Sequence, residues 1–323
     1  MDLANQILDF FKDYFAEFIS VLPYFIAGVI SEAIIRTYKW HIKIKQTIHK
    51  YSAISIFLAT ILGLISPLCA CGVLPLSLGL LFAGVPFSIM MTLVISSPLL
   101  SPAGFTLTQW ELGTKWALAK TFSAAFMGLY AGFLTLLLEK KYFKHHQILK
   151  ISEIPHDMDF HDPDFPIEEL RCSCHKQFSH TVEAKTKNKF FIFLAKFYEG
   201  TVRIGKYVLI GILFEILILK YVPAEWISKY LSEGSITNIF LVTIFSIPLY
   251  VNQITASAML YSLVEKGISN GAALAFLIGG PVTAIPVMAV FFTMFRKRVI
   301  IYYLAVCISG TMIVSLVYQW FFS

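Results

Sequence analysis

Charged residues are scarce in this sequence, at 14% of 323 positions, whereas a soluble chain of this size carries about a quarter. Hydrophobic residues make up 57% of the chain, more than a fold surrounded by water could bury. Several runs of about 20 residues carry little or no charge, which is the length that a membrane-spanning helix needs. These runs lack the alternating polarity of transmembrane β-strands. The composition therefore predicts an all-α membrane protein whose first partner is the lipid bilayer.

Other absences narrow the function. The sequence has no nucleotide-binding P-loop, which argues against direct ATP drive. The first fifteen residues contain Asp2, Lys12 and Asp13 and do not have the pattern of a cleaved signal peptide. The five cysteines are too few and too unevenly placed for a disulfide scaffold. The net charge of +6 comes from basic residues at helix ends, so we expect no nucleic-acid partner.

We expect about ten membrane segments in two groups of five. Membrane repeat 1 covers residues 1–138, a polar loop covers 139–200, and membrane repeat 2 covers 201–323. The expected segments are Phe15–Ile35, Tyr51–Ser66, a stretch ending near Gly84, Pro86–Thr108, Trp116–Leu138, Thr201–Leu219, Ile236–Val251, Ile254–Val264, Ser269–Met294 and Val299–Phe322. Twenty Lys and Arg residues lie on one side (36–50, 139–206 and 296–298), against three on the other. The positive-inside rule then predicts a cytoplasmic polar loop.

The two groups of segments resemble each other. A shift of 183 residues superimposes five identical residue pairs: Tyr24 on Tyr207, Gly28 on Gly211, Glu32 on Glu215, Gly84 on Gly267 and Pro98 on Pro281. An odd number of crossings in each group would make the two copies antiparallel. This predicts two inverted five-segment repeats, an architecture of many secondary transporters. The alternative is similarity that arises from apolar composition alone.

The first group contains a segment that breaks its own helix. Between Ser66 and Pro75 two prolines and Gly72 interrupt an apolar run that also carries Cys69 and Cys71. Broken helices at matching points of two repeats indicate a transport site near the midplane of the membrane. The shift places Asn252 opposite Cys69, with Gln253 beside it. We predict that Cys69, Cys71, Gly72, Pro75, Asn252 and Gln253 contact the substrate.

The cysteines in this segment indicate the chemistry of that substrate. Thiols are soft ligands that suit Cu(I), Zn and other thiophilic species, including trivalent arsenic. The alternative is that Cys69 and Cys71 are small buried packing residues, as free cysteines often are. A second set of helix breakers contains Pro98 in one copy and Pro281 in the other, which could line the same site or simply allow close packing.

Two further groups carry candidate roles. Glu32 and Glu215 are ionisable residues within apolar helices, which makes them candidates for proton coupling. Arg36, one turn after Glu32, offers a plain ion pair as the alternative. In the polar loop, Cys172, Cys174 and His175 are candidate ligands for a soft metal, although their spacing is not that of a zinc finger. A solvated loop of mixed charge is the alternative.

The run from Pro67 to Pro102 resembles the ArsP-type predicted permeases. It reads Cys-x-Cys-Gly-x-x-Pro, followed by Gly84-Val85-Pro86 and Ser97-Pro98. The resemblance implies export of a small thiophilic substrate across a bacterial cytoplasmic (inner) membrane, with Cys69 and Cys71 in the motif. Family members often have Asn-Pro where this chain has Ser101-Pro102. The Cys- and His-containing loop is closer to the metal-exporting relatives than to a minimal organoarsenical permease.

These observations predict a secondary permease that exports an organoarsenical, copper or zinc species, with proton antiport as its energy source. No enzyme activity is expected and no cofactor is required, apart from a transported or loop-bound soft metal. Two alternatives stay open from the sequence. One is a membrane subunit of a larger complex, and the other is an intramembrane thiol oxidoreductase that uses Cys69 and Cys71. A facilitative channel is a further variant, and the oligomeric state is left open.

Overall fold

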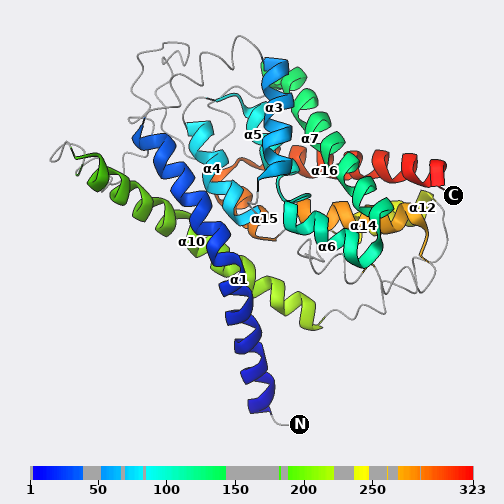
Figure 1. Cartoon of the computed structure of the whole chain (residues 1–323), viewed down its shortest axis with the longest axis horizontal. Helices are drawn as coiled ribbons and strands as arrows, with labels where there is room; N and C mark the ends of the chain where they lie inside the picture. The colour runs from blue at the N-terminus through cyan, green and yellow to red at the C-terminus, as the bar shows by residue number, and fades with distance from the viewer. Residues whose placement is uncertain are drawn as a thin grey trace.

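The structure is a computed structural model that describes residues 3–38, 52–66, 70–82, 85–142, 182, 188–221, 236–246, 260, 268–283 and 285–322. The elements in these ranges are helices, as the composition predicts (Figure 1). They are α1 (Leu3–Thr37), α3 (Ser52–Ile65), α4 (Ala70–Phe82), α5 (Phe87–Ser96), α6 (Pro102–Leu112), α7 (Thr114–Tyr142), α10 (Lys189–Tyr221), α12 (Ile236–Ser246), α14 (Asn270–Val282), α15 (Ile285–Met294) and α16 (Lys297–Phe322).

Two of the predicted membrane segments differ from the prediction. The run Pro86–Thr108 is not one span but the two helices α5 and α6, and Ser269–Met294 is likewise the two helices α14 and α15. Helices of 10 to 13 residues are about 15–20 Å long, which is shorter than the hydrocarbon core of a bilayer, about 30 Å. Each of these runs is therefore a pair of short helices, of which α5 and α14 are buried along their length.

The helix bounds repeat along the chain at the spacing of 183 residues. Shifted by this amount, α3 spans 235–248, α6 spans 285–295 and α7 spans 297–325, close to the observed α12, α15 and α16. The packing repeats as well, because α3 contacts both α5 and α7, and α12 contacts both α14 and α16. Residues 183 positions apart are called counterparts below.

Helices α1 and α10 cross each other in opposite directions (Figure 1). Three contacts join them: Tyr14 with Leu209, Phe25 with Gly205, and Tyr38 with Lys189. The first is a hydrogen bond of 3.4 Å, and in the third the lysine ammonium lies 5.4 Å from the ring centre. As residue numbers rise along α1, those of the partners in α10 fall, so the two helices are antiparallel.

The last helix of each group repeats this relation. The contacts between α7 and α16 join Trp116 with Tyr318, Met127 with Gly310, Tyr130 with Ser309, and Thr135 with Tyr302. The numbers again rise along one helix and fall along the other, so α7 and α16 are antiparallel. Met127 and Gly310 are counterparts of each other, so the two helices touch at an equivalent point of each.

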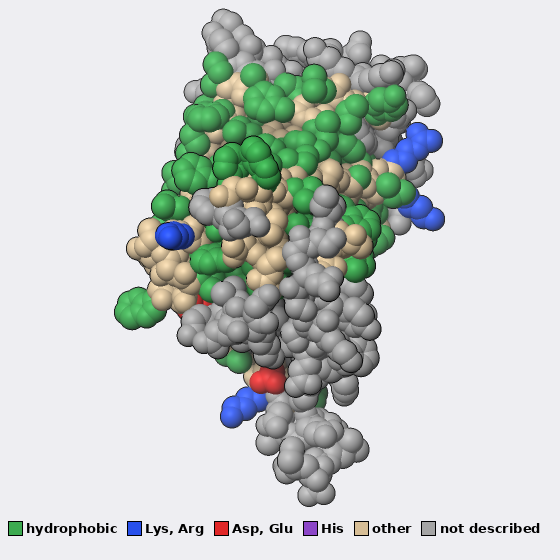
Figure 2. Space-filling model, turned by 90° about the vertical axis from the view of Figure 1, so that its right-hand side faces the viewer, with side chains coloured by type: hydrophobic (Ala, Val, Ile, Leu, Met, Phe, Trp, Pro, Cys, Tyr) green, Lys and Arg blue, Asp and Glu red, His purple; other side chains and the backbone are tan. Residues whose placement is uncertain are grey.

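Burial separates an inner layer from an outer one. Every residue of α5 is buried, and so is every residue of α14 from Gly271 to Val282. The outer helices α3, α7 and α16 expose large hydrophobic side chains, such as Phe122 at 72% and Leu62 at 64%. Figure 2 shows hydrophobic side chains over most of the described surface on one face, with charged side chains towards its margins. Such a surface suits contact with lipid.

By length and composition, two of the described helices could cross a membrane on their own. They span Thr114–Glu139 in α7 and Lys297–Phe321 in α16, and their bounds are again about 183 residues apart. Helices α3, α5 and α14 are apolar but shorter. Each of the two long helices packs against one of the buried short helices, α7 against α5 and α16 against α14.

Candidate functional site

The first half contains a break between α5 and α6. Pro98 has no amide hydrogen and cannot continue the hydrogen bonding of α5, whose last turn ends with the Ser97 amide donating to the Leu93 carbonyl at 3.1 Å. A new helix starts at Ser101, whose hydroxyl accepts a hydrogen bond of 3.0 Å from the Gly104 amide. Pro102 follows at the first position of α6, where its missing amide costs nothing.

The second half contains the corresponding break between α14 and α15. Pro281 lies inside the last turn of α14, and Thr283 ends the helix. The Thr283 amide and hydroxyl both donate to the Gly279 carbonyl, at 3.3 Å and 2.9 Å. We call residues Ser97–Leu100 and Thr283 the paired breaks. Pro98 and Pro281 are counterparts, so the same feature of the sequence ends both helices.

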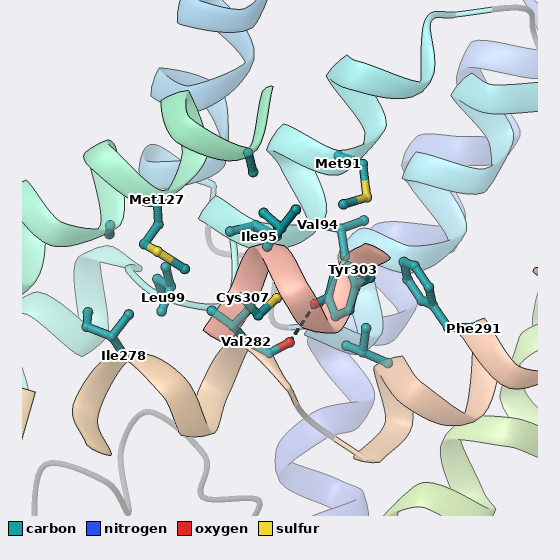
Figure 3. Packing of buried hydrophobic residues seen from close by; sticks show 14 of the residues in the cluster. Met91, Val94, Ile95, Leu99, Met127, Ile278, Val282, Phe291, Tyr303 and Cys307 are labelled. Carbon is teal, nitrogen blue, oxygen red and sulfur yellow. Dashed lines mark hydrogen bonds between the residues drawn. The ribbon is translucent and has the colours of Figure 1, made fainter. Parts of the chain in front are cut away.

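Both breaks border the same buried core. Leu99 and Val282, which directly follow the two prolines, belong to one buried cluster together with Met127 and Cys307 (Figure 3). The hydroxyl of Tyr303 donates a hydrogen bond of 2.6 Å to the Val282 carbonyl, within the last turn of α14. Residues from α5, α7, α14 and α16 therefore surround the point where the two short helices end.

A close contact between two helices lies next to each break. A Cβ atom on Gly63 of α3 would collide with the side chain of Ser96 in α5. A Cβ atom on Gly279 of α14 would collide with the hydroxyl of Ser246 in α12. Ser246 is the counterpart of Gly63, and Gly279 is the counterpart of Ser96. The two halves thus make the same contact with glycine and serine exchanged.

Gly72 lies where α4 crosses α1. A Cβ atom on Gly28 would lie 2.7 Å from the Cα of Gly72 and would also overlap its carbonyl group, so the two backbones are in direct contact. This contact fixes the first turn of α4, which also contains Cys71. Helix α4 packs in addition against α5 and α15, the helices that adjoin the paired breaks.

The predicted site residues fall into two groups. Gly72, Pro98 and Pro281 are buried at the helix crossing and the paired breaks. Cys71 and Pro75 lie on α4 and Glu32 and Glu215 on α1 and α10, but their side chains lie outside the described residues, as do Cys69, Asn252, Gln253, Cys172, Cys174 and His175 altogether. Among the residues that are described, no group of three His, Cys, Asp or Glu side chains could hold a metal ion. The predicted substrate contacts and metal ligands stay predictions.

The sequence reasoning missed a polar cap at the start of each inner helix. Glu139 of α7 accepts hydrogen bonds from the amides of Phe87 and Ser88 at 2.7 Å and 3.2 Å, at the N-terminus of α5. Gln319 of α16 accepts one of 2.6 Å from the amide of Gly271, near the N-terminus of α14. Ser88 and Gly271 are counterparts. Glu139 ends an apolar run, where the sequence predicts the start of the polar loop, so no sequence signal points to the cap.

Two short buried helices that break opposite each other, held between long apolar helices, define a class of helical membrane protein with a discontinuous core. The chain belongs to the ArsP_1 family of predicted permeases, whose model matches residues 4–320. It is also similar to the UPF0718 protein YcgR of Bacillus subtilis (strain 168), with 21% identity over 322 residues, 98% of this chain and 100% of that protein. No solved structure matches the chain.

The family and the apolar helices together make the chain a membrane permease. This confirms, over nearly the whole chain, the resemblance that is strongest in the 36 residues around the Cys-x-Cys-Gly-x-x-Pro run. A permease moves its substrate unchanged, which is consistent with the expectation that the chain is not an enzyme.

Proposed function

We propose that the chain is a secondary permease built from two inverted five-segment repeats, which exports a thiophilic metal or metalloid species and confers resistance to it. The substrate is an organoarsenical, copper or zinc species, and a proton gradient drives its efflux. The protein lies in the bacterial cytoplasmic membrane with the 139–200 loop on the cytoplasmic side, where the excess of Lys and Arg favours it.

One observation supports the proposed transport mechanism most directly: helices at equivalent positions of the two halves are antiparallel. This relation between α1 and α10, and between α7 and α16, is the one expected of inverted repeats. In transporters of that kind, substrate binds where discontinuous helices of both repeats meet, and rocking of one repeat against the other alternates access. The paired breaks, with Leu99 in the first and Val282 directly before the second, are the described candidates for that meeting point.

The chemistry of the sulfur-containing residues supports the substrate class. Cys69 and Cys71 flank the start of α4, which packs against helices next to both breaks. Met127 and Cys307 supply a thioether and a thiol to the cluster between the breaks. Thioethers and thiols are the ligands that soft ions prefer, and arsenic(III) shares this preference.

Uptake into inside-out vesicles tests the proposal. The panel contains trivalent organoarsenicals, arsenite, Cu(I) and Zn(II), each with and without a proton gradient. We compare the wild type with Cys69→Ser/Cys71→Ser, and we use Cys172→Ser/Cys174→Ser as the matched control for the loss of two thiols. Accumulation of one panel member that needs Cys69 and Cys71, but not the loop cysteines, is the expected result.

Other outcomes contradict separate parts of the proposal. Accumulation that survives Cys69→Ser/Cys71→Ser removes these thiols from the transport path, and the same assay of Cys307→Ser then tests the thiol between the breaks. Accumulation that does not depend on the gradient indicates a facilitative channel. If no panel member accumulates, thiophilic export is wrong, and a membrane subunit of a larger complex becomes the better interpretation.

A further inference from the structure

One face of α16 carries a polar side chain at every fourth position. Residues four apart lie one above the other on the same side of a helix. The first four of these residues are buried, and the fifth is partly buried in the last turns of the helix. We call them the polar stripe: Tyr303, Cys307, Thr311, Ser315 and Gln319.

The polar stripe is directed at α14. Gln319 accepts the hydrogen bond of 2.6 Å from the Gly271 amide. The methyl group of Thr311 lies 3.7 Å from the position that a Cβ atom on Gly279 would take. Ser315 lies between Thr311 and Gln319 on the same face of α16. At both printed contacts α14 meets the stripe with a glycine, which offers a hydroxyl no side-chain partner.

Two hydroxyls of the polar stripe are left without a partner. Thr311 Oγ1 and Ser315 Oγ are buried and form no hydrogen bond with any residue that the structure describes. Serine and threonine within a helix can donate to the carbonyl four residues earlier. Ser309 of α16 does so at 2.7 Å, and Thr243 of α12 at 2.8 Å. Burying a hydroxyl without such a bond is unfavourable, which indicates a ligand for both hydroxyls in another state of the protein.

The first half places the corresponding hydroxyls on the other helix. The counterparts of Thr311 and Ser315 on α7 are both glycines. These glycines pack against Ser96 and Thr92 of α5. Both hydroxyls of α5 donate within their own helix, Thr92 at 2.9 Å and Ser96 at 2.8 Å. Of these two equivalent crossings, only the one in the second half therefore contains hydroxyls without a described partner.

The polar stripe belongs to α16 alone. The counterpart of Tyr303 on α7 is Lys120, which is buried and donates a hydrogen bond of 3.2 Å to the hydroxyl of Thr108 in α6. The other four counterparts are apolar: Ala124, Gly128, Gly132 and Leu136. A continuous polar face thus runs along one of the two long helices and not along the other.

The polar stripe leads from the paired breaks towards one membrane surface. At its start, Tyr303 donates to the Val282 carbonyl at the end of α14 (Figure 3). The sixteen steps from Tyr303 to Gln319 rise about 24 Å along α16, most of the hydrocarbon core of about 30 Å. Residues 296–298, at the start of α16, are all basic, and the positive-inside rule favours the cytoplasmic side for them. In this orientation the stripe leads outward.

We propose that the contact between α14 and the polar stripe is the path by which the substrate leaves the paired breaks, and that Thr311 and Ser315 form hydrogen bonds with it there. This inference rests on the proposed function. Both side chains are buried in this structure, so the path opens when α14 moves away from α16. A hydroxyl donates and accepts hydrogen bonds but is not a soft ligand. The site therefore fits a metal or metalloid species that carries hydroxyl or water ligands of its own, and not bare Cu(I).

Thiol labelling tests the path without any substrate. Single cysteines are introduced as Thr311→Cys and Ser315→Cys into the full chain, in which the five native cysteines are serine, and the protein is reconstituted in liposomes. Ile313→Cys and Val317→Cys are the matched controls, because they lie at similar depth on α16 and are 40% and 50% exposed on its outer face. A charged methanethiosulfonate reagent added from the outer side should modify the first pair at least about tenfold faster, since a thiol in apolar surroundings is unreactive.

Two results of the labelling overturn the proposal. Equal rates at all four positions would show that the stripe is no more hydrated than the outer face of α16. Reaction from the cytoplasmic side alone would show that the path does not open outward. Size-exclusion chromatography checks the fold of the chain without native cysteines. If that chain is misfolded, the same four substitutions are made in the native sequence and labelling above its background is measured.

Transport by variants of nearly equal volume tests the hydrogen bonds. Thr311→Val and Ser315→Ala each remove one hydroxyl. With the panel member that the wild type accumulates, each should raise KM by about fivefold with little change in the maximal rate. The thermal midpoint should not fall, because neither hydroxyl forms a described hydrogen bond in the folded protein. Thr243→Val is the control: its hydroxyl is satisfied within α12, and KM should stay within about twofold of the wild type.

The remaining outcomes separate this proposal from the proposed function. An unchanged KM in both variants overturns the proposal, and so does a lower thermal midpoint with a proportional loss of transport, which assigns a structural role to the hydroxyls. A wild type that accumulates Cu(I) alone overturns the substrate class. A wild type that transports nothing contradicts the proposed function, but the labelling still decides whether the path exists.

Discussion

The two halves of this permease share a framework and differ in the side chains that complete it. In the first half α5 packs between α3 and α7, and in the second half α14 packs between α12 and α16. At the tightest crossing, Gly63 faces Ser96 in one half, and Ser246 faces Gly279 in the other. The glycine lies on the outer helix α3 in the first half and on the inner helix α14 in the second. The two halves therefore share the combined volume of the two side chains at this contact, not the residue at each position. Close packing through small residues is the main attraction between helices in lipid.

The two halves differ in the charge of the polar side chains that contact the short helices. The first half holds α5 with the carboxylate of Glu139 and buries Lys120, whereas the second half uses the amide of Gln319 and the phenol of Tyr303 at similar places. The following predictions test which contacts are equivalent in the two halves and which are not.

The largest effect is expected at the crossing of α1 with α4. Gly28→Ala places a methyl group against the backbone of Gly72, which cannot rotate away as a side chain can. We expect a loss of about 3 kcal/mol in stability, despite the gain in helix propensity of about 1 kcal/mol that alanine brings. The thermal midpoint in detergent and the monodisperse fraction measure it.

Gly205→Ala in α10 is the matched control for this change. Its new methyl group would lie 3.7 Å from the Phe25 ring, an ordinary contact, so this variant should be at least as stable as the wild type. Equal effects of the two substitutions would show that the α1–α4 crossing is no tighter than the α1–α10 crossing.

The sequence predicted the framework better than the crossings. Apolar runs predict membrane helices because lipid leaves backbone groups no partner outside the helix. Pro98 and Pro281 could be recognised as helix breakers from their missing amides. The division of Pro86–Thr108 into α5 and α6 was not predicted, because proline in an apolar run is also compatible with a kinked single span. The new start at Ser101 depends on local capping within that run.

The candidate site was less predictable because it depends on contacts between distant segments. Lys120 was not distinguished from the lysines of loops, since its burial comes from α6 folding back on α7. The cap by Glu139 joins residues 52 and 51 positions apart. The substrate role of Cys69, Cys71, Asn252 and Gln253 is still a prediction from the sequence alone.

The second prediction exchanges the glycine and serine of one half to match the other. Gly63→Ser alone should cost about 2 kcal/mol, because its hydroxymethyl group collides with Ser96. Adding Ser96→Gly removes the collision and should recover stability to within about 1 kcal/mol of the wild type. Thermal unfolding of the two single variants and the double variant measures the recovery.

The reciprocal exchange serves as the control in the second half. Gly279→Ser should destabilise in the same way, and Ser246→Gly should rescue it. If the double variants are no more stable than the worse single variant, the contacts are not equivalent and the packing of the halves differs more than their helix bounds indicate.

The third prediction concerns the caps. Glu139→Leu leaves two amides at the start of α5 without an acceptor and should cost about 2 kcal/mol, whereas Glu139→Gln retains an acceptor and should cost about 1 kcal/mol or less. Gln319→Leu removes the single bond at Gly271 and should fall between the two. Hydrogen exchange of the first turns of α5 and α14 reports each cap, and a Glu139→Gln as harmful as Glu139→Leu would mean that the charge outweighs the hydrogen bonds.

The smallest effect is expected where the halves join, at the contact of α7 with α16. Tyr130 and Ser309 form a hydrogen bond of 3.0 Å, and Ser309 also donates to the Ala305 carbonyl at 2.7 Å, so the tyrosine is the donor in the contact between helices. A double-mutant cycle of Tyr130→Phe and Ser309→Ala should give a coupling energy of about 0.6 kcal/mol, typical of polar contacts between membrane helices. A coupling this small fits the proposed alternating access, in which contacts between the two moving repeats break and re-form in every cycle. A coupling above about 2 kcal/mol would instead make α7 and α16 a fixed unit and confine any rocking to α1 and α10.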